Sequence, residues 1–285
     1  MSTFVLGLSL ACLLFILAAG LTLIFGMLGV INFAHGSLYM VGAYASYQAV
    51  LSTGSFVLGL LAACLLAGAV GLAMEYLALR RLYQRSHVDQ LLLTFGCILV
   101  IESATRVFWG QDYKQVAVPG ALAQVVEWGD DRIPTYRLFI VAVAVAVSAL
   151  LFGLLERTRL GLMVRAASVD ADTAATLGVR VASLRTLVFV GGAALAGFGG
   201  AMAAPLVPLE LGMGFGIVID CFIVVIIGGL GNIRGAILAA LLIGMTRAIG
   251  FRFAPDWVEV ATFTLLIATL LIRPQGLFAR KERKA

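Results

Sequence analysis

The sequence predicts an all-α polytopic membrane protein with about nine transmembrane helices, eight being the alternative count. Of its 285 residues, 62% are hydrophobic and 12% are charged, whereas soluble domains carry about 25% charged residues. No formally charged side chain precedes Glu75. Apolar runs of about 20 residues, the length that a helix needs to cross the hydrocarbon core, recur along the chain. We therefore expect lipid to surround most of this protein.

Nine apolar segments are candidates for these spans. Six are clear, namely 4–28, 56–79, 90–109, 138–156, 186–205 and 257–272. Three are less regular, namely 36–51, 213–230 and 236–250. If 36–51 is re-entrant, eight spans remain and the N-terminus is cytoplasmic. We favour nine spans with a periplasmic N-terminus, in a single transmembrane domain over residues 1–285.

Basic residues gather in three regions, which places those regions in the cytoplasm. They are the stretch from Arg80 to Arg85, the loop 157–185 and the tail 280–284, which together hold 12 of the 20 Lys and Arg residues. The loop 110–137 carries mixed charge and belongs outside. An even number of spans must separate the loop 157–185 from the cytoplasmic C-terminus. Residues 231–235 should therefore form a turn on the cytoplasmic side.

Glycines and polar residues interrupt two apolar segments, near 26–37 and 228–235. Irregular backbone survives at membrane depth only inside protein or along a watery cavity, and broken helices often line transporter paths. The candidates for a translocation path are Asn32, His35, Gly36, Asp220, Gly228, Gly229 and Gly231. The alternative is a plain interhelical turn with His35 bonded to a neighbouring carbonyl. The likeness of the two interruptions also suggests an internal repeat.

The loop 157–185 contains a predicted amphipathic helix. From Leu162 to Leu177 its residues favour a helix, and Gly178 is a natural C-terminal stop. The apolar positions Leu160, Val164, Ala167, Ala171 and Ala174 recur every three or four residues, opposite Arg165, Ser168, Asp172 and Thr176. Such a helix with few bulky groups can fit a groove on a partner protein. The alternative, a helix lying on lipid headgroups, usually carries larger apolar anchors.

Several charged residues fall inside predicted spans, where each costs roughly 3 kcal/mol at a helix centre. Glu102 and Arg106 stand four apart with the acid first, the geometry of a helical ion pair. Asp220 and Arg247 can pair between two short helices or face the path. Glu75 lies near a cytoplasmic helix end, within reach of Arg80 or Arg81.

The sequence contains no pattern typical of a catalytic or metal-binding site. The cysteines are scattered in apolar runs without a CxxC pair, so no metal site is expected. No G-x-x-x-x-G-K-[ST] phosphate loop is present, and no catalytic constellation stands out. The basic pI near 9.2 fits cytoplasmic loops better than nucleic-acid binding. A docking helix without an ATPase motif suggests that a separate chain hydrolyses ATP.

A set of short motifs spreads in order over almost the whole chain. The set comprises 29–36 (Gly-Val-Ile-Asn-Phe-Ala-His-Gly), Gly42-Ala43-Tyr44, Arg159-Leu160-Gly161, Arg165-Ala166, Asp170, Leu177-Gly178, 228–231 (Gly-Gly-Leu-Gly), Gly235-Ala236 and 273–278 (Arg-Pro-Gln-Gly-Leu-Phe). In these motifs the chain resembles the permease subunits of branched-chain amino-acid ABC importers, in particular the shorter of the two permeases that such systems use.

The resemblance implies a subunit of the bacterial inner membrane that moves amino acids, branched-chain or related small solutes, into the cytoplasm. Its partners would be a second permease, two ATP-binding subunits that hold ATP and Mg, a periplasmic substrate-binding protein and membrane lipid. This chain would bind no cofactor. The coupling residues would be Gly161, Arg165, Ala166, Asp170, Ala174, Leu177 and Gly178. The family also moves urea, amides and aromatic acids, so the substrate does not follow.

Two positions depart from the family's pattern. The Glu-Ala-Ala-x-x-x-Gly motif of many importers is only approximated by 174–178, and the turn at 232–235 reads Asn-Ile-Arg-Gly where relatives often have proline before the glycine. The alternative function is a self-sufficient secondary transporter or channel for small solutes.

Overall fold

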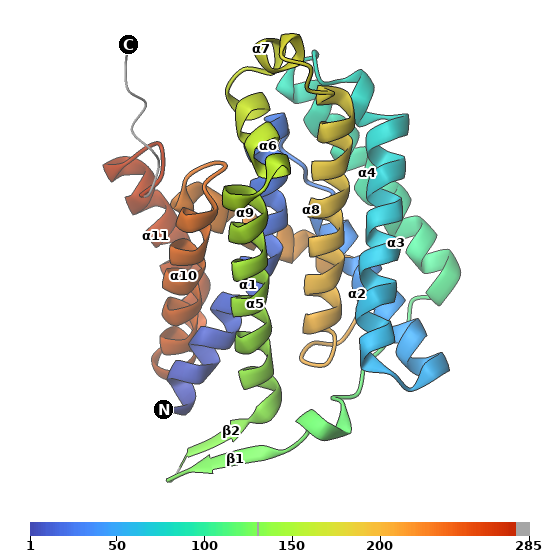
Figure 1. The fold of residues 1–285 in the computed structure, drawn as a ribbon. Helices are drawn as coiled ribbons and strands as arrows, with labels where there is room; N and C mark the ends of the chain where they lie inside the picture. Colours follow the sequence, from blue (N-terminus) through green and yellow to red (C-terminus); the bar gives the residue numbers. More distant parts are fainter. Residues whose placement is uncertain (130, 278–285) are drawn as a thin grey trace.

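The computed structural model describes residues 1–129 and 131–277, and it consists mainly of helices packed side by side (Figure 1). The α-helices of the described residues are α1 (Ser2–Leu28), α2 (His35–Thr53), α3 (Phe56–Leu77), α4 (His87–Trp109), α5 (Thr135–Arg157), α6 (Arg159–Val169), α7 (Ala171–Thr176), α8 (Val181–Ala203), α9 (Met213–Gly228), α10 (Ile233–Phe253) and α11 (Val258–Ile272). Short 3₁₀ helices occupy Leu79–Arg81, Gly120–Leu122 and Pro255–Trp257. The all-α polytopic class is confirmed.

Seven helical segments within the described residues are long and apolar enough to cross a membrane, namely Ser2–Leu28, Phe56–Arg81, His87–Trp109, Thr135–Arg157, Val181–Ala203, Ile233–Phe253 and Pro255–Ile272. The other two predicted spans correspond to α2 and α9. The helix α2 is more polar than the seven, and α9 has only 16 residues, about 24 Å of helix. Each of the nine predicted segments is thus helical, but two of them are not self-sufficient spans.

One element was not predicted. In the loop 110–137, β1 (Val125–Trp128) pairs antiparallel with β2 (Asp131–Pro134). This hairpin lies at the same end of the bundle as the N-terminus, and α6 and α7 lie at the opposite end (Figure 1). The Met1 amine contacts the Asp131 carboxylate at 2.8 Å. The N-terminus and the loop 157–185 therefore lie at opposite ends of the molecule, as an odd number of crossings requires.

The helix α1 is the centre of the bundle. It packs against α5, α8, α9 and α10. Of the 18-residue apolar stretch of α1, 72% is buried, whereas only 17% of the corresponding stretch of α4 or α5 is buried. Small residues on α8 make close helix contacts, since a Cβ at Gly200 would lie 2.1 Å from the Tyr39 carbonyl oxygen of α2. Buried small residues on α1, α2 and α8 thus let the three backbones approach closely.

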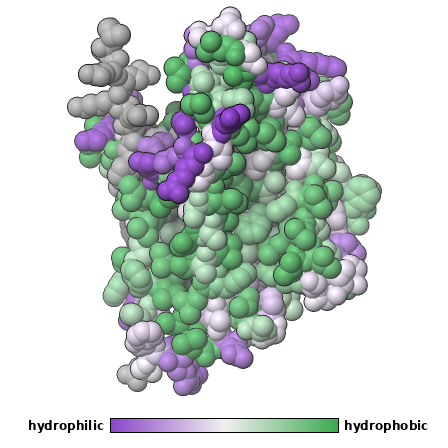
Figure 2. Space-filling view, viewed as in Figure 1, coloured by the Kyte–Doolittle hydropathy of each residue, from purple (hydrophilic) through white to green (hydrophobic). Residues whose placement is uncertain are grey.

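The outer surface matches a lipid environment. Hydrophobic side chains cover the flank of the bundle, and hydrophilic ones gather toward its two ends (Figure 2). Large apolar side chains on the outward faces are exposed, among them Leu65, Leu92, Val107 and Leu150. In water this surface would be far larger than the apolar patches of soluble proteins, whereas hydrocarbon solvates it directly.

Candidate translocation and coupling sites

The chain turns back into the bundle directly after α1. Gly29 ends the helix with φ 66°, and residues 29–34 form no helix before α2 begins at His35. The His35 Nε2–H donates to the Leu17 carbonyl oxygen at 3.0 Å. Leu17 lies 11 residues before the last residue of α1, which is roughly 16 Å along a helix. The segment 29–34 therefore descends to about half the depth of α1.

The N-terminal ends of α2 and α9 meet at that depth. Gly36 and Gly214 are the second residues of their helices, and a Cβ at Gly36 would lie 1.9 Å from the Gly214 carbonyl oxygen. The reciprocal distance, from a Cβ at Gly214 to the Gly36 oxygen, is 2.4 Å. Helix N-termini carry unpaired N–H groups and a partial positive charge. Two such ends thus converge in the interior of the bundle.

Unpartnered polar atoms accompany these helix ends. The Asn32 side chain is fully buried, and neither its amide oxygen nor its amide nitrogen has a hydrogen-bond partner among the described residues. The same is true of the His35 Nδ1 atom. Buried polar groups are nearly always paired, so these atoms have hydrogen-bonding capacity that no described residue uses. The structure brings together Asn32, His35 and Gly36 of the predicted path; Gly214, 178 positions further on, was missed.

The other predicted glycines lie elsewhere. Gly228, Gly229 and Gly231 form the turn between α9 and α10, where Gly231 packs against Gly26 near the end of α1. A Cβ at Gly228 would lie 2.6 Å from the Gly235 carbonyl carbon, so this turn is tightly closed. Gly26, which this turn contacts, is nine residues from Leu17, about two and a half turns along α1. The non-helical segment 29–34 leads into α2, and the non-helical segment 204–212 leads into α9. Because Gly36 and Gly214 are in contact, the interruption paired with 29–34 is 204–212 and not the predicted 228–235.

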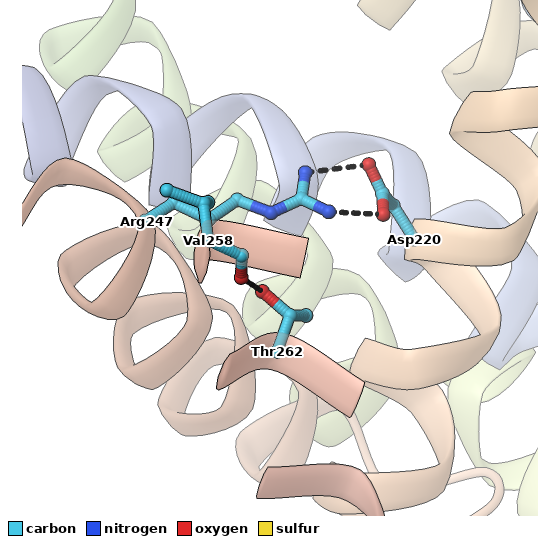
Figure 3. A network of polar contacts seen from close by, with 4 residues as sticks. All are labelled: Asp220, Arg247, Val258 and Thr262. Carbon is cyan, nitrogen blue, oxygen red and sulfur yellow. Dashed lines mark hydrogen bonds and ion pairs between the residues drawn. The ribbon is translucent and has the colours of Figure 1, made fainter. Parts of the chain in front are cut away.

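Asp220 lies neither with Asn32 and His35 nor in the glycine turn, but in an ion pair between α9 and α10. Its carboxylate on α9 accepts two hydrogen bonds from the Arg247 guanidinium on α10, at 2.6 and 2.5 Å. Figure 3 shows this bidentate pair beside α11, where the Thr262 hydroxyl donates to the Val258 carbonyl oxygen at 2.9 Å. Of the two arrangements that the sequence left open, the structure has the pair. The pair neutralises both charges and joins the short helix α9 to its neighbour.

Of the two remaining predicted charge contacts, one is present and the other has different partners. Glu102 and Arg106 lie 3.9 Å apart on α4, a loose pair with half of the Arg106 side chain exposed. Glu75 does not pair with Arg80 or Arg81. Its buried carboxylate instead accepts hydrogen bonds from the Tyr83 hydroxyl at 3.0 Å and the Thr186 hydroxyl at 2.8 Å. These two bonds tie the end of α3 to the following loop and to α8.

The predicted helix of the loop 157–185 is broken in two. α6 ends at Val169, and Asp170, with extended backbone, becomes the N-cap of α7. The Asp170 Oδ1 atom accepts from the N–H groups of Asp172 and Thr173 at 3.0 and 2.9 Å. A hydrogen bond from the Thr173 hydroxyl, together with these two from the backbone, lowers the pKa of the Asp170 carboxyl. α7 ends before Gly178, which has φ 89°, so the predicted stop is confirmed.

The apolar face of α6 and α7 packs on the chain itself. Val164, Ala167 and Ala174 are buried in a cluster with Met27 of α1 and Leu184 of α8. Of the seven predicted coupling residues, Gly161 and Ala174 are buried, and Arg165, Ala166, Asp170, Leu177 and Gly178 are exposed. The exposed surface also includes Leu162 and Val169, the latter 88% exposed. The outer face therefore combines bulky apolar, charged and small side chains, whereas Gly161, Ala167 and Ala174 serve internal packing.

The described residues contain no group of three or more His, Cys, Asp or Glu that could hold a metal ion. The cysteines at 12, 64, 97 and 221 are free thiols.

Lipid-facing helices surround two helix ends that converge inside the bundle, and the helix pair α6–α7 is exposed at one end. This is the architecture of an integral-membrane permease. The sequence matches, over residues 3–270, the family described as the branched-chain amino acid transport system permease component. The chain belongs to this family.

Curated relatives agree with this assignment. The chain is 32% identical over 296 residues to the high-affinity branched-chain amino acid transport system permease protein BraD of Pseudomonas aeruginosa, covering 97% of this chain and 94% of the relative. It is 27% identical to the corresponding LivH protein of Escherichia coli, with the same coverage. It is 28% identical to the probable branched-chain amino acid transport permease protein LivH of Methanocaldococcus jannaschii, covering 93% of this chain and 88% of the relative.

Proposed function

We propose that this chain is the transmembrane permease subunit of an ATP-driven importer of amino acids, branched-chain or related small solutes, in the bacterial inner membrane. ATP and Mg would be bound by separate ATPase subunits, and this chain would hold no cofactor. A second permease subunit and a periplasmic substrate-binding protein complete the proposed assembly. The relatives named above support the transport class, and the clustering of basic residues supports a cytoplasmic position for α6, α7 and the C-terminus.

The observation that carries the coupling role is the contact between α6 and the end of α1. The buried face of α6 packs on Met27, two residues before the Gly29 break. A displacement of α6 and α7 by an ATPase subunit would therefore act directly on the segment that leads to Asn32 and His35. Packed interiors transmit such displacements because they are hardly compressible.

The proposed path runs between α2 and α9 where their N-terminal ends meet. In the closed arrangement Gly36 and Gly214 are in contact, and no space for a solute exists between them. Separation of the two helix ends would uncover backbone N–H groups and the Asn32 amide. An amino acid offers a carboxylate to such donors, as anions do at other helix N-termini. Selection among solutes is assigned mainly to the substrate-binding protein.

Reconstitution of the assembled importer in proteoliposomes tests the proposal. With binding protein outside and ATP inside, we expect uptake of a branched-chain amino acid that stops when the ATPase subunits are omitted. Uptake that persists without them, driven by an ion gradient, would establish the secondary-transporter alternative instead.

Charge reversal tests the coupling surface separately. The variants Arg165→Glu and Asp170→Arg should insert normally but hydrolyse ATP without uptake. Arg132→Glu, which alters an exposed arginine of the hairpin at the opposite end, is the matched control and should keep coupled uptake. Wild-type coupling in both α6–α7 variants would contradict the assignment.

A further inference from the structure

A cavity of about 360 Å³ lies at the α7 end of the molecule. Its walls come from three places in the chain: the turn after α3, the helix α7 and the first turns of α8. The polar side chains that line it are those of Arg80, Arg81, Tyr83, Gln84, Asp172 and Arg185. None of the predicted path or coupling residues lines it.

The cavity is strongly basic. Arg80, Arg81 and Arg185 line it against one carboxylate, that of Asp172. None of the three arginines forms an ion pair with a residue of the part of the chain that the structure describes. The buried acid Glu75, which is bonded to the lining residue Tyr83, accepts hydrogen bonds from the Tyr83 and Thr186 hydroxyls and not from an arginine. Three guanidinium groups therefore outnumber the Asp172 carboxylate in the lining and the Glu75 carboxylate beside it, and the cavity keeps a net positive charge.

Aromatic rings hold two of these guanidinium groups in place. The Arg185 guanidinium carbon lies 5.1 Å from the centroid of the Tyr83 ring, and that of Arg80 lies 5.7 Å from the Tyr76 ring. Tyr83 is itself fixed by its hydrogen bond to Glu75. Stacked in this way, an arginine is pre-organised to offer its N–H groups to a planar or tetrahedral anion.

An exposed apolar surface continues from the cavity along the flank of the bundle. Tyr76 and Leu77 at the end of α3 are 60% and 62% exposed, and Leu187 on α8, two residues after Arg185, is 51% exposed. The helices α3 and α8 pack against each other. The basic cavity thus opens beside an exposed apolar surface at one end of the bundle, the arrangement that suits a lipid with a charged headgroup and apolar chains.

We propose that this cavity binds the phosphate of an anionic glycerophospholipid, with an acyl chain lying on the exposed face of α3 and α8. Basic pockets between transmembrane helices on the cytoplasmic side suit such headgroups. Because Asp172 and Ala175 of α7 form one wall, a bound lipid would link α7 to α3 and α8. The site is independent of which solute the permease moves.

Lipid-dependent thermal stability of the purified full-length chain in neutral detergent tests this site. Phosphatidylglycerol should raise the melting temperature, whereas phosphatidylcholine with the same acyl chains should not. Inorganic phosphate forms a third arm, since it offers the same oxygens without the chains. A rise with inorganic phosphate equal to that with phosphatidylglycerol would show a free-anion site and overturn the lipid assignment, as would equal rises with the two lipids.

Variants locate the effect. Replacing Arg80, Arg81 and Arg185 by glutamine should weaken the apparent affinity for phosphatidylglycerol about fivefold per arginine removed. Lysine at the same three positions should restore most of the affinity, which separates lost charge from misfolding. Arg132→Gln, at the opposite end, is the control and should bind as wild type. If the glutamine variants bind lipid normally but no longer capture the ATPase subunits, the cavity is a protein interface and the proposal is wrong.

Discussion

Gly36 and Gly214 lie where two backbones touch, and their side-chain hydrogens are the only groups that fit there. A methyl group on either residue would overlap the carbonyl oxygen of the other. A backbone atom at the start of a buried helix cannot move aside as a flexible side chain can. The meeting of α2 and α9 therefore depends on the absence of a Cβ at both positions.

Gly36→Ala should lower the unfolding free energy by about 3 kcal/mol, the upper part of the range for overpacked sites, and abolish most uptake. Thermal unfolding in detergent and proteoliposome uptake measure the two effects. Gly216→Ala on α9, two residues beyond the glycine that Gly36 contacts, is the control, because nothing lies within 4 Å of a Cβ there. Equal stability of the two variants would mean that the helix ends do not meet.

Asp170 permits a second prediction at the residue scale. Its pKa is lowered by hydrogen bonds from Thr173 and Asp172, so the carboxylate form stabilises the start of α7. That contribution is present above the ordinary carboxyl pKa and is lost as the pH falls through the lower folded value. Between roughly pH 5 and 8 it should not change.

Asp170→Asn can still accept the capping hydrogen bonds and should retain most coupled uptake, whereas Asp170→Ala should lose it. Uptake at several pH values checks both variants. Strong loss in Asp170→Asn would point to an ionic contact with a partner and against a capping role.

At the scale of helices, the short helix α9 is held in position by packing against its neighbours. It is too short to cross the bilayer alone, and its contacts with α1, α2, α10 and α11 surround it. The Asp220–Arg247 pair adds a polar bond between α9 and α10, with both side chains about 80% buried. Breaking a buried pair from one side leaves an uncompensated charge.

Asp220→Asn or Arg247→Met alone should therefore destabilise the protein by about 3–5 kcal/mol, and the double variant should recover much of the loss. Denaturant unfolding in detergent provides the measurement. Glu102→Gln on α4 is the comparison, and it should cost less than about 1 kcal/mol because that pair is loose and exposed. Similar losses in Glu102→Gln and Asp220→Asn would contradict this ranking.

The sequence predicted one helix from Leu162 to Leu177, and the structure has two, α6 and α7. The apolar positions Val164, Ala167 and Ala174 were placed correctly on one face. That they face α1 and α8 could not be read from periodicity, which gives a face but not its partner. The break itself had a local signal, since aspartate followed by Ala-Asp-Thr suits an N-cap, but good helix formers on both sides outweighed it.

At the scale of the whole molecule, apolar run length predicted nine segments that are all helical, seven of them long and apolar enough to cross a membrane. The basic stretches 80–85 and 157–185 lie at one end and the loop 110–137 at the other, whereas the basic tail 280–284 lies outside the described residues. The β-hairpin was missed because its strands have four residues each, too few for a period-two pattern. The depth of the 29–34 break could not be predicted either. It depends on the contact between His35 and Leu17 and on a glycine in α9, and no local pattern encodes such distances.

The orientation can be tested by cysteine labelling in a variant whose four native cysteines are replaced by serine or alanine. Gln84→Cys should react only with reagent on the cytoplasmic side, and Trp128→Cys, at a residue 67% exposed in the hairpin, only from the periplasm. Intact and inverted membrane vesicles give the two readings. Labelling of both positions from one side would refute an odd number of crossings between them.

The contact of two helix N-termini at mid-depth has a consequence for energy conservation. Each end contributes a partial positive charge, and both lie where the low-dielectric surroundings strengthen electrostatic effects. A proton or sodium ion that leaked along this route would meet a repulsive potential, as at the paired half-helices of water channels. A permease closed in this way can remain in an energised membrane without draining the ion gradients that other transporters use.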